Sequence, residues 1–365
     1  MSGGGVTGPS DLDKVPGPML NERTRLMVFL CLVAVGCGSV GNGLPKDGAA
    51  GGGGAGGTAT DGPSSTGGAA DGGATDTGGP ADARSDAPAS ACDLSKPFAA
   101  PALVTALNSS GNEDALTFSA DGLTAYLSSG RTGGLGLADI WFATRASTAQ
   151  DFGAPVLVEG VNTASDERGP WISKDGLLLF FFSLPPGGAS YHFVVAARQT
   201  TVAAFAAPAA VAGLNSSGSD ATLWFSGDER TVYFSSTRTG GLGDYDIWVA
   251  DFGASGASNV RAIQELNSAA NESWPVLTPD GLTVYYSSGK ASAGVSARNH
   301  IWMASRSSLN DGFGGQHVVM ELSSTASEWP TWISADGCTL YFGSDRPSAD
   351  GGASSIKFYV ATRGR

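Results

Sequence analysis

Five acidic side chains recur in this sequence, each eight residues before an aspartate that opens a turn: Glu113, Glu167, Asp220, Glu272 and Glu328. Carboxylates gathered around one opening could coordinate a hard cation such as calcium or hold a basic ligand. They could also pair with a nearby cation or accept loop N–H bonds, and so lock neighbouring repeats together. Because a structural device is needed in every repeat, the fivefold recurrence favours the structural interpretation and leaves the site interpretation open.

A second group of residues is unrepeated, which is better support for a ligand site. Trp274 and Trp329 lie beside the acidic positions in adjacent repeats, whereas the other six tryptophans share two repeat positions. Asp114, Asp166 and Arg168 are unrepeated polar residues in equivalent segments. Tryptophans near carboxylates could stack a sugar or a peptide side chain. The alternative is that the two tryptophans only plug the centre of the domain.

Motifs for common catalytic chemistry are missing. The sequence has no G-x-S-x-G elbow, no G-x-x-x-x-G-K-[ST] loop, no C-x-x-C pair and no zinc spacing. A glycan hydrolase that uses two carboxylates from Glu113, Asp114, Asp166 and Glu167 is the remaining enzymatic alternative. The near-uniform repetition of the acids argues against this alternative.

The elements that must position these residues follow from an internal repeat. Five Asp-led turns open at residues 121, 175, 228, 280 and 336, each preceded by an apolar stretch and followed five residues later by an aromatic residue. A third strand begins at 139, 192, 246, 300 and 357, and a weaker fourth at 97, 152, 205, 259 and 314. Four short strands whose apolar residues are consecutive predict sheets packed on both faces, as in propeller blades.

The motif S-x-D-G, then aromatic pairs, then S-x-R and D-I-W resembles the repeat of TolB-type, WD-like β-propellers, and the resemblance covers 97–365. In such propellers the segment that enters the innermost strand and the loop between the second and third strands open on the face around the central channel. The resemblance therefore implies that the five carboxylates ring a channel mouth. It places four cations on the same face: Arg131, Arg238, Lys290 and Arg346. Repeat 2 departs from the pattern, with Leu184-Pro185 where the others end in Arg or Lys.

The two ends of the repeat region predict how the propeller closes. The last repeat stops at its third strand, while 97–104 supplies a spare fourth strand in front of the first repeat. Pairing 97–104 antiparallel to 356–362 would complete the last blade and remove an exposed sheet edge. We therefore expect an all-β fold over 92–365, a single β-propeller of five four-stranded blades.

Residues 1–37 predict export and lipid anchoring. Two arginines precede an apolar stretch at 26–36, which is too short to span a bilayer of ~30 Å and fits a secretory signal. Residues 34–37 resemble a bacterial lipobox, which implies diacylglyceryl attachment at Cys37, and Gly38 resembles outer-membrane sorting. Met19 is an alternative start, and an ordinary signal peptide or uncleaved anchor is the alternative to the lipobox.

The segment 38–91 predicts a disordered tether, because it is almost entirely Gly, Ala, Ser, Thr, Asp and Pro. The net charge of −13 argues against nucleic-acid binding and against contact with anionic membranes, so the lipid anchor is the expected membrane contact.

Cys92 and Cys338 remain in the mature domain, and export places them where a disulfide persists. In the propeller topology both lie near the face opposite the channel mouth. One strand separates them, roughly 10 Å at 4.7–4.9 Å per strand, and the lead-in to the closing strand covers the remainder. We predict a Cys92–Cys338 disulfide, with two free thiols as the alternative.

These observations favour a non-enzymatic, envelope-anchored binding or scaffolding module, whose partner is an envelope protein, a peptide or a glycan. No cofactor is expected beyond a cation such as calcium at the acidic ring. A channel carboxylate pair with no cation beside it would favour the hydrolase, whereas carboxylates paired to arginine or lysine would favour the module.

Overall fold

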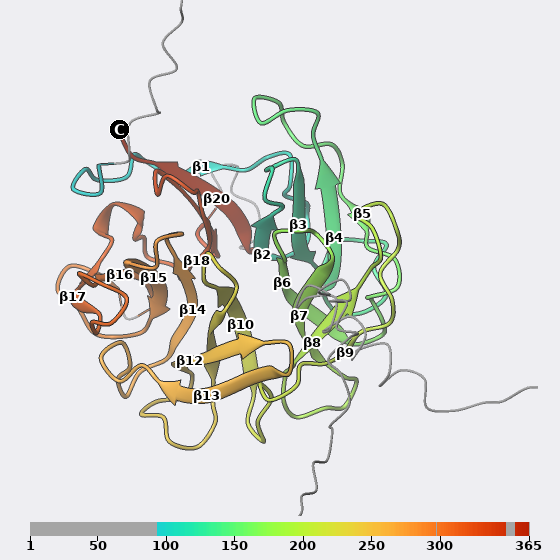
Figure 1. Cartoon of the computed structure of the whole chain (residues 1–365). Helices are drawn as coiled ribbons and strands as arrows, with labels where there is room; N and C mark the ends of the chain where they lie inside the picture. The colour runs from blue at the N-terminus through green and yellow to red at the C-terminus, as the bar shows by residue number, and fades with distance from the viewer. Residues whose placement is uncertain (1–92, 297, 348–354, 365) are drawn as a thin grey trace, which may run out of the picture. The chain divides into compact units, whose positions relative to one another are not determined.

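The strands form five four-stranded antiparallel sheets arranged as a ring, a five-bladed β-propeller (Figure 1). This computed structural model describes residues 93–296, 298–347 and 355–364. The predicted leader 1–37, the linker 38–91, Cys37 and Cys92 lie outside the described residues. Among those residues no helix is long and apolar enough to cross a membrane.

The blades follow one another along the chain. Blade 1 contains β2 (Glu113–Phe118), β3 (Thr124–Ser129), β4 (Asp139–Thr144) and β5 (Val156–Leu157). Blade 2 contains β6 (Asp166–Ile172), β7 (Leu178–Leu184), β8 (His192–Ala197) and β9 (Ala209–Ala210). Blade 3 contains β10 (Asp220–Phe225), β11 (Thr231–Ser236), β12 (Asp246–Gly253) and β13 (Gly256–Ala262). Blade 4 contains β14 (Glu272–Leu277), β15 (Thr283–Ser288), β16 (His300–Ser305) and β17 (Gly314–Val318), and a 3-10 turn follows at Met320–Leu322. Blade 5 contains β18 (Glu328–Ile333), β19 (Thr339–Ser344), β20 (Lys357–Thr362) and β1 (Ala102–Leu103).

The closing strand lies where the sequence predicts it. β1 pairs antiparallel with β20, Ala102 opposite Val360, and an isolated bridge joins Phe98 to Arg363. The fourth strand of blade 5 therefore comes from the beginning of the domain, which covers the outer edge of β20.

Each Asp-led turn is fixed by its own side chains. In blade 1, Asp121 accepts a bond from the Ser119 hydroxyl at 2.6 Å and from the Leu123 N–H at 2.9 Å, and Gly122 adopts φ 69°. Blade 3 has Glu229 at the glycine position, at φ 59°. Because these bonds are local, the turn forms in every repeat and sets the register of the first two strands.

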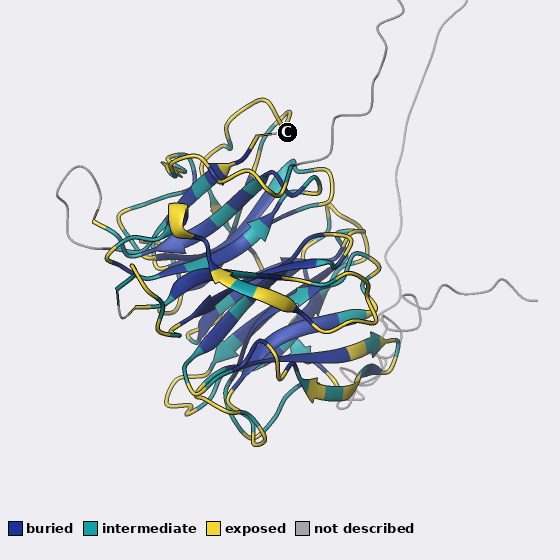
Figure 2. Ribbon diagram, turned by 90° about the vertical axis from the view of Figure 1, so that its left-hand side faces the viewer, coloured by how far each residue is buried: buried dark blue, intermediate teal, exposed yellow. Residues whose placement is uncertain are grey.

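The hydrophobic core consists of layers between blades. Five clusters of buried residues each join two neighbouring blades; one of them packs Leu116 and Leu127 of blade 1 with Phe358 of blade 5. In Figure 2 the inner strands are mostly buried, while the exposed residues gather in turns, loops and outer strands. Each blade therefore depends on both neighbours for the burial of its two faces.

Candidate functional site

A cavity of about 400 Å³ opens where the innermost strands begin and the loops between second and third strands end. Asp114, Arg168, Trp274 and Trp329 line it, and Asp166 contacts Arg168. The fold therefore gathers all five unrepeated residues that the sequence singles out, from four different blades. We call this cavity the channel mouth.

An ion-pair cluster spans blades 1 and 2 at the mouth. Arg168 Nε lies 2.9 Å from both carboxylate oxygens of Asp166, and Arg168 Nη1 lies 3.1 Å from Asp114 Oδ2. The Tyr191 hydroxyl donates to Asp166 Oδ2 at 2.6 Å, and the Ala138 N–H donates to Asp166 Oδ1 at 3.1 Å. Both carboxylates are thus held by one guanidinium, whose side chain is 28% exposed to the cavity.

Burial dominates the electrostatics of this cluster. It raises the pKa of Asp114 above its ordinary value, against the opposing effect of the Arg168 charge. Burial and the hydrogen bond to Asp166 raise the pKa of Tyr191 to about 12. The Tyr191 hydroxyl therefore remains a hydrogen-bond donor at neutral pH.

The two unrepeated tryptophans form an aromatic wall beside the ion pairs. The ring centroids of Trp274 and Trp329 are 6.1 Å apart, with an interplanar angle of 32°. Trp329 Nε1 donates to the backbone carbonyl of Asp114 at 2.8 Å, which fixes the indole across the blade boundary. Trp274 adopts φ 57°, a left-handed conformation that is rare for a bulky residue and costs of order 1–3 kcal/mol.

The backbone strain arises from β-bulges. All five innermost strands shift register within four residues of the repeated acid. In blades 2, 3 and 4 the bulge residue has positive φ: Gly169, Thr222 and Trp274. A bulge re-aims side chains and is enriched next to functional sites. Trp274 is thus a large side chain at a position where Gly169 satisfies the backbone without strain.

The channel is nearly filled below the mouth. A cavity of about 20 Å³ lies there, lined by Trp274 together with Gly169, Thr222 and Pro330. Trp274 therefore belongs to the floor of the mouth as well as to its wall. The plug and the stacking surface, which the sequence presents as alternatives, are compatible in this geometry.

None of the five repeated acids lines the mouth cavity, and each is 0–1% exposed. Three of them pair with a cation of their own blade: Glu113 with Arg131 at 3.0 Å, Asp220 with Arg238 at 2.7 Å and Glu328 with Arg346 at 3.1 Å. Each of these arginines also donates to a backbone carbonyl, that of Leu107, Leu214 or Leu322. These contacts favour the structural interpretation for the three acids.

Glu272 and Glu167 differ from the other acids. Glu272 accepts bonds from the Ser268 N–H and from the Ser268 and Ser288 hydroxyls, while Lys290 donates to the Leu266 carbonyl. Glu167 accepts a bond from the Thr163 hydroxyl at 2.5 Å, but its Oε2 has no partner within the described chain. Burial raises the pKa of Glu167 above its ordinary value.

Sequence reasoning missed Tyr191, which donates to the ion-pair cluster, and Asn271, whose buried Oδ1 lacks a partner among the described residues. Both line the mouth. Tyr191 lies directly before the third strand, where blades 1, 4 and 5 carry Ala138, Asn299 and Ile356. Variation at a position that faces the channel is the signal that would have indicated it.

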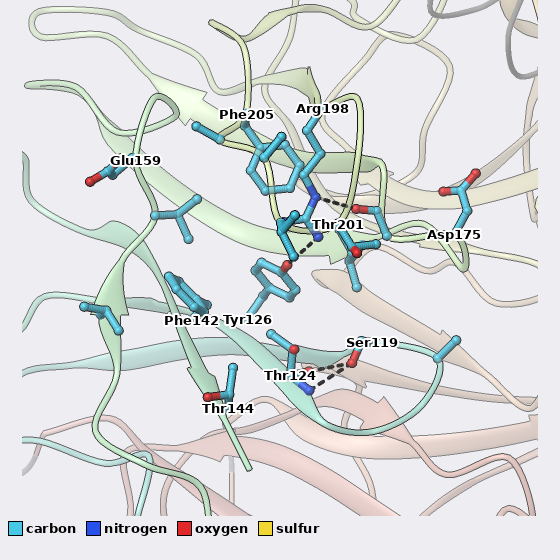
Figure 3. A pocket seen from close by; sticks show the side chains of 18 of the residues that line it. Ser119, Thr124, Tyr126, Phe142, Thr144, Glu159, Asp175, Arg198, Thr201 and Phe205 are labelled. Atoms are coloured by element: carbon cyan, nitrogen blue, oxygen red, sulfur yellow. Dashed lines mark hydrogen bonds between the residues drawn. The ribbon is translucent and has the colours of Figure 1, made fainter. Parts of the chain in front are cut away.

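A larger cavity of about 740 Å³ lies on the opposite face, between blades 1 and 2. Figure 3 shows Arg198 at its centre, bonded to the Gly176 carbonyl and to the Tyr126 hydroxyl. This arginine contact recurs at other blade boundaries, whereas the residues of the mouth are unrepeated. We therefore regard the mouth, although smaller, as the candidate site.

No protein-family model matches the chain, and no curated protein matches it. Solved structures with a similar fold include a protein described as TolB from Agrobacterium tumefaciens (19% identity, TM-score 0.41, 69% of this chain and 74% of that one). They also include the α-L-arabinofuranosidase PaAbf62A from Podospora anserina (10%, 0.45, 74% and 97%) and an exo-β-1,3-galactanase from Phanerochaete chrysosporium (10%, 0.43, 73% and 63%). At these identities and TM-scores the likeness carries no argument about function, and it is the strand pairing of this chain that makes it a five-bladed β-propeller.

Proposed function

We infer that this protein is a non-enzymatic binding module that takes a ligand at the channel mouth. The observation that carries the inference is the pairing of both unrepeated carboxylates with Arg168 beside the Trp274–Trp329 wall. A glycoside hydrolase needs one carboxyl group as acid and a second, free carboxylate as base or nucleophile, at a separation set by mechanism. Asp114 and Asp166 share the guanidinium of Arg168. This arrangement is better suited to positioning a bound ligand than to transferring a proton.

The chemistry of the mouth narrows the ligand. Among the described residues of the mouth, the two carboxylates Asp114 and Asp166 share the guanidinium of Arg168, so the cavity favours a neutral or positively charged group. The tilted indoles offer flat apolar surface next to hydrogen-bonding groups. A short peptide or a glycan segment of an envelope partner meets both requirements.

The location of the module is part of the same proposal. The lipobox-like residues before Cys37 support an exported lipoprotein anchored to the outer membrane, with 38–91 as its tether. A tether of this composition reaches roughly 40 Å, at ~5–6 Å × √n. Labelled palmitate should enter the protein, and Cys37→Ser should prevent its incorporation.

Binding can be tested with the purified full chain on peptide and glycan arrays, after capture of partners from envelope extracts. Trp274→Ala and Trp329→Ala should each weaken the ligand found at least about tenfold, because aromatic side chains at the centre of a site carry most of the binding energy. Val202→Ala is the matched control, since Val202 is 94% exposed on the opposite face. If both tryptophan variants bound the ligand as tightly as the parent chain, the assignment of the binding site to the channel mouth would be wrong.

The glycan-hydrolase alternative has one observation in its favour, the raised pKa of Asp114, because a general acid must hold its proton. Incubation of captured glycans with the full chain distinguishes the two functions. Cleavage that Asp114→Asn abolishes would replace the binding module with the enzyme.

A further inference from the structure

A recurring backbone contact brings each repeated acid to the blade before it. The acid's N–H donates to the carbonyl of the residue that precedes the previous blade's third strand, at 2.7–3.0 Å at all five boundaries. The first residue of that third strand therefore faces the acid. Between blades 4 and 5 this places His300 Nδ1 2.8 Å from Glu328 Oε2.

Four of the five boundaries carry a basic side chain at one fixed position, two residues after a serine of the second strand: Arg131, Arg238, Lys290 and Arg346. Each of these side chains donates to the carbonyl six residues before the acid of its own blade. At the boundary between blades 1 and 2 this position is Pro185. The third-strand residue there is Asp139, a second acid. The equivalent residue is Asp246 between blades 3 and 4, where Lys290 is present, and His192, His300 or Lys357 at the other boundaries.

The blade 1–blade 2 boundary therefore buries two carboxylates without the basic side chain of the repeat. Asp139 and Glu167 are each 1% exposed. Asp139 Oδ2 accepts bonds from the N–H groups of Leu135 and Gly136, and its Oδ1 has no partner among the described residues, as is also true of Asp246. Glu167 Oε2 lacks a partner there too, whereas the equivalent Oε2 of Glu272 accepts the Ser268 N–H. Two facing carboxylates that are removed from water repel one another and lose hydration, so an uncompensated pair is strongly unfavourable.

We propose that a hard divalent cation of calcium's class binds at this boundary, between Asp139 Oδ1 and Glu167 Oε2. Gly136, whose N–H donates to Asp139, packs against backbone carbonyls of the loop before Glu167: a Cβ on Gly136 would lie 1.8 Å from the carbonyl oxygen of Ser165 and 3.2 Å from that of Thr163. Calcium takes carboxylate and carbonyl oxygens in a flexible shell completed by water. The cation supplies the positive charge that arginine or lysine supplies in the other blades.

The donor set predicts modest affinity. No group of three or more His, Cys, Asp or Glu side chains suited to a metal converges within the described ranges. Two carboxylates and backbone carbonyls resemble weak calcium modules, with dissociation constants of roughly 10⁻⁴–10⁻³ M. The ion would join two blades and stabilise the fold, and it takes no part in ligand binding at the mouth.

The test is calcium titration of the chelator-treated full chain, followed by calorimetry and thermal unfolding. Calcium at about a hundred times its dissociation constant should raise the Tm by roughly 5–10 °C. Asp139→Asn should abolish both binding and the Tm shift. Asp246→Asn is the matched control, because Asp246 holds the equivalent position beside a blade that has Lys290, and this variant should keep the full response.

Pro185→Arg tests the same idea in the opposite direction. It restores the guanidinium of the other blades, so the metal-free Tm should rise and the Tm shift caused by calcium should fall. This measurement does not depend on whether Asp139→Asn folds. The proposal would be overturned if the parent chain did not bind millimolar calcium and Asp139→Asn raised the metal-free Tm. That pair of results would show that the two carboxyl groups share a proton. Loss of the response in Asp246→Asn would also overturn the proposal.

Discussion

At the scale of single residues, a missing side chain decides where Trp329 lies. A Cβ on Gly343 would lie 2.5 Å from Trp329 Cε2, closer than real contacts allow. The equivalent second-strand position is serine in blades 1, 3 and 4: Ser128, Ser235 and Ser287. Glycine in place of serine in blade 5 thus accompanies the unrepeated tryptophan of the same blade and leaves the space that its indole occupies.

Gly343→Ser should therefore displace Trp329 and break its hydrogen bond to the Asp114 carbonyl. We expect the mouth ligand to bind about tenfold more weakly or worse, while the five-bladed fold persists because blades 1, 3 and 4 carry serine there. Affinity on the array and quenching of tryptophan fluorescence measure this. Gly253→Ala is the control, since nothing lies within 4 Å of a Cβ at that position. Unchanged ligand affinity in Gly343→Ser would show that the position of the Trp329 indole does not affect ligand binding.

At the scale of elements, an arginine at the end of the third strand joins neighbouring blades. Its guanidinium stacks on a phenylalanine of its own blade at 3.7–4.4 Å in four blades: Arg145 on Phe152, Arg198 on Phe205, Arg306 on Phe313 and Arg363 on Phe98. It also reaches the previous blade's tyrosine hydroxyl, as in Arg198–Tyr126, Arg306–Tyr233 and Arg363–Tyr285. Blade 3 has Phe252 at this position, and blade 2 correspondingly has Phe180 instead of tyrosine; the two rings meet edge-on, with centroids 5.8 Å apart. The hydroxyl is absent where its partner is absent, because a buried hydroxyl without a partner is costly.

This contact predicts an energetic coupling between blades 3 and 4. Tyr233→Phe and Arg306→Gln should each lower the free energy of unfolding, and the double variant should lose less than the sum, with a coupling of about 1–2 kcal/mol. Urea denaturation measures the cycle. The control cycle combines Tyr233→Phe with Arg145→Gln, a distant pair, and the two losses in free energy of unfolding should add. An equal coupling energy in both cycles would mean that the Arg306–Tyr233 hydrogen bond is not the source of the coupling.

At the scale of the whole domain, closure repeats the local chemistry with residues from opposite ends of the sequence. Phe98, just before β1, stacks on Arg363, just after β20, as Phe152 stacks on Arg145 within blade 1. Arg363 also donates to the Leu94 carbonyl and, through its backbone N–H, to that of Cys338. The Leu94 side chain lies near Gly337, since a Cβ there would be 3.4 Å from Leu94 Cδ2. The beginning and end of the domain thus meet beside Cys338.

These contacts support the predicted Cys92–Cys338 bond. Cys338 is disulfide-bonded, and Cys92 lies outside the described residues, so the pairing stays a prediction. Peptide mapping of the unreduced protein should find Cys92 joined to Cys338, and reduction should lower stability by up to roughly 5 kcal/mol in the chain-entropy model. Alkylation of Cys92 in the native, oxidised protein would refute the pairing.

The repeat, the Asp-led turns, the number of blades and the closing strand could all be predicted from the amino-acid pattern. Those features rest on local hydrogen bonds and on alternating strands and turns, which leave a mark at each repeat. The pattern also indicated the unrepeated residues of the mouth and the exceptional loop at Leu184-Pro185.

Only the tertiary structure decided which carboxylates are paired, and with what. Asp114 and Arg168 are 54 positions apart and meet across a blade boundary. The five repeated acids are buried and do not line the mouth, whereas Asp114, Arg168, Trp274 and Trp329, which follow them on the bulged strands, do. Such contacts depend on how neighbouring blades pack, and no local pattern in a single chain records that.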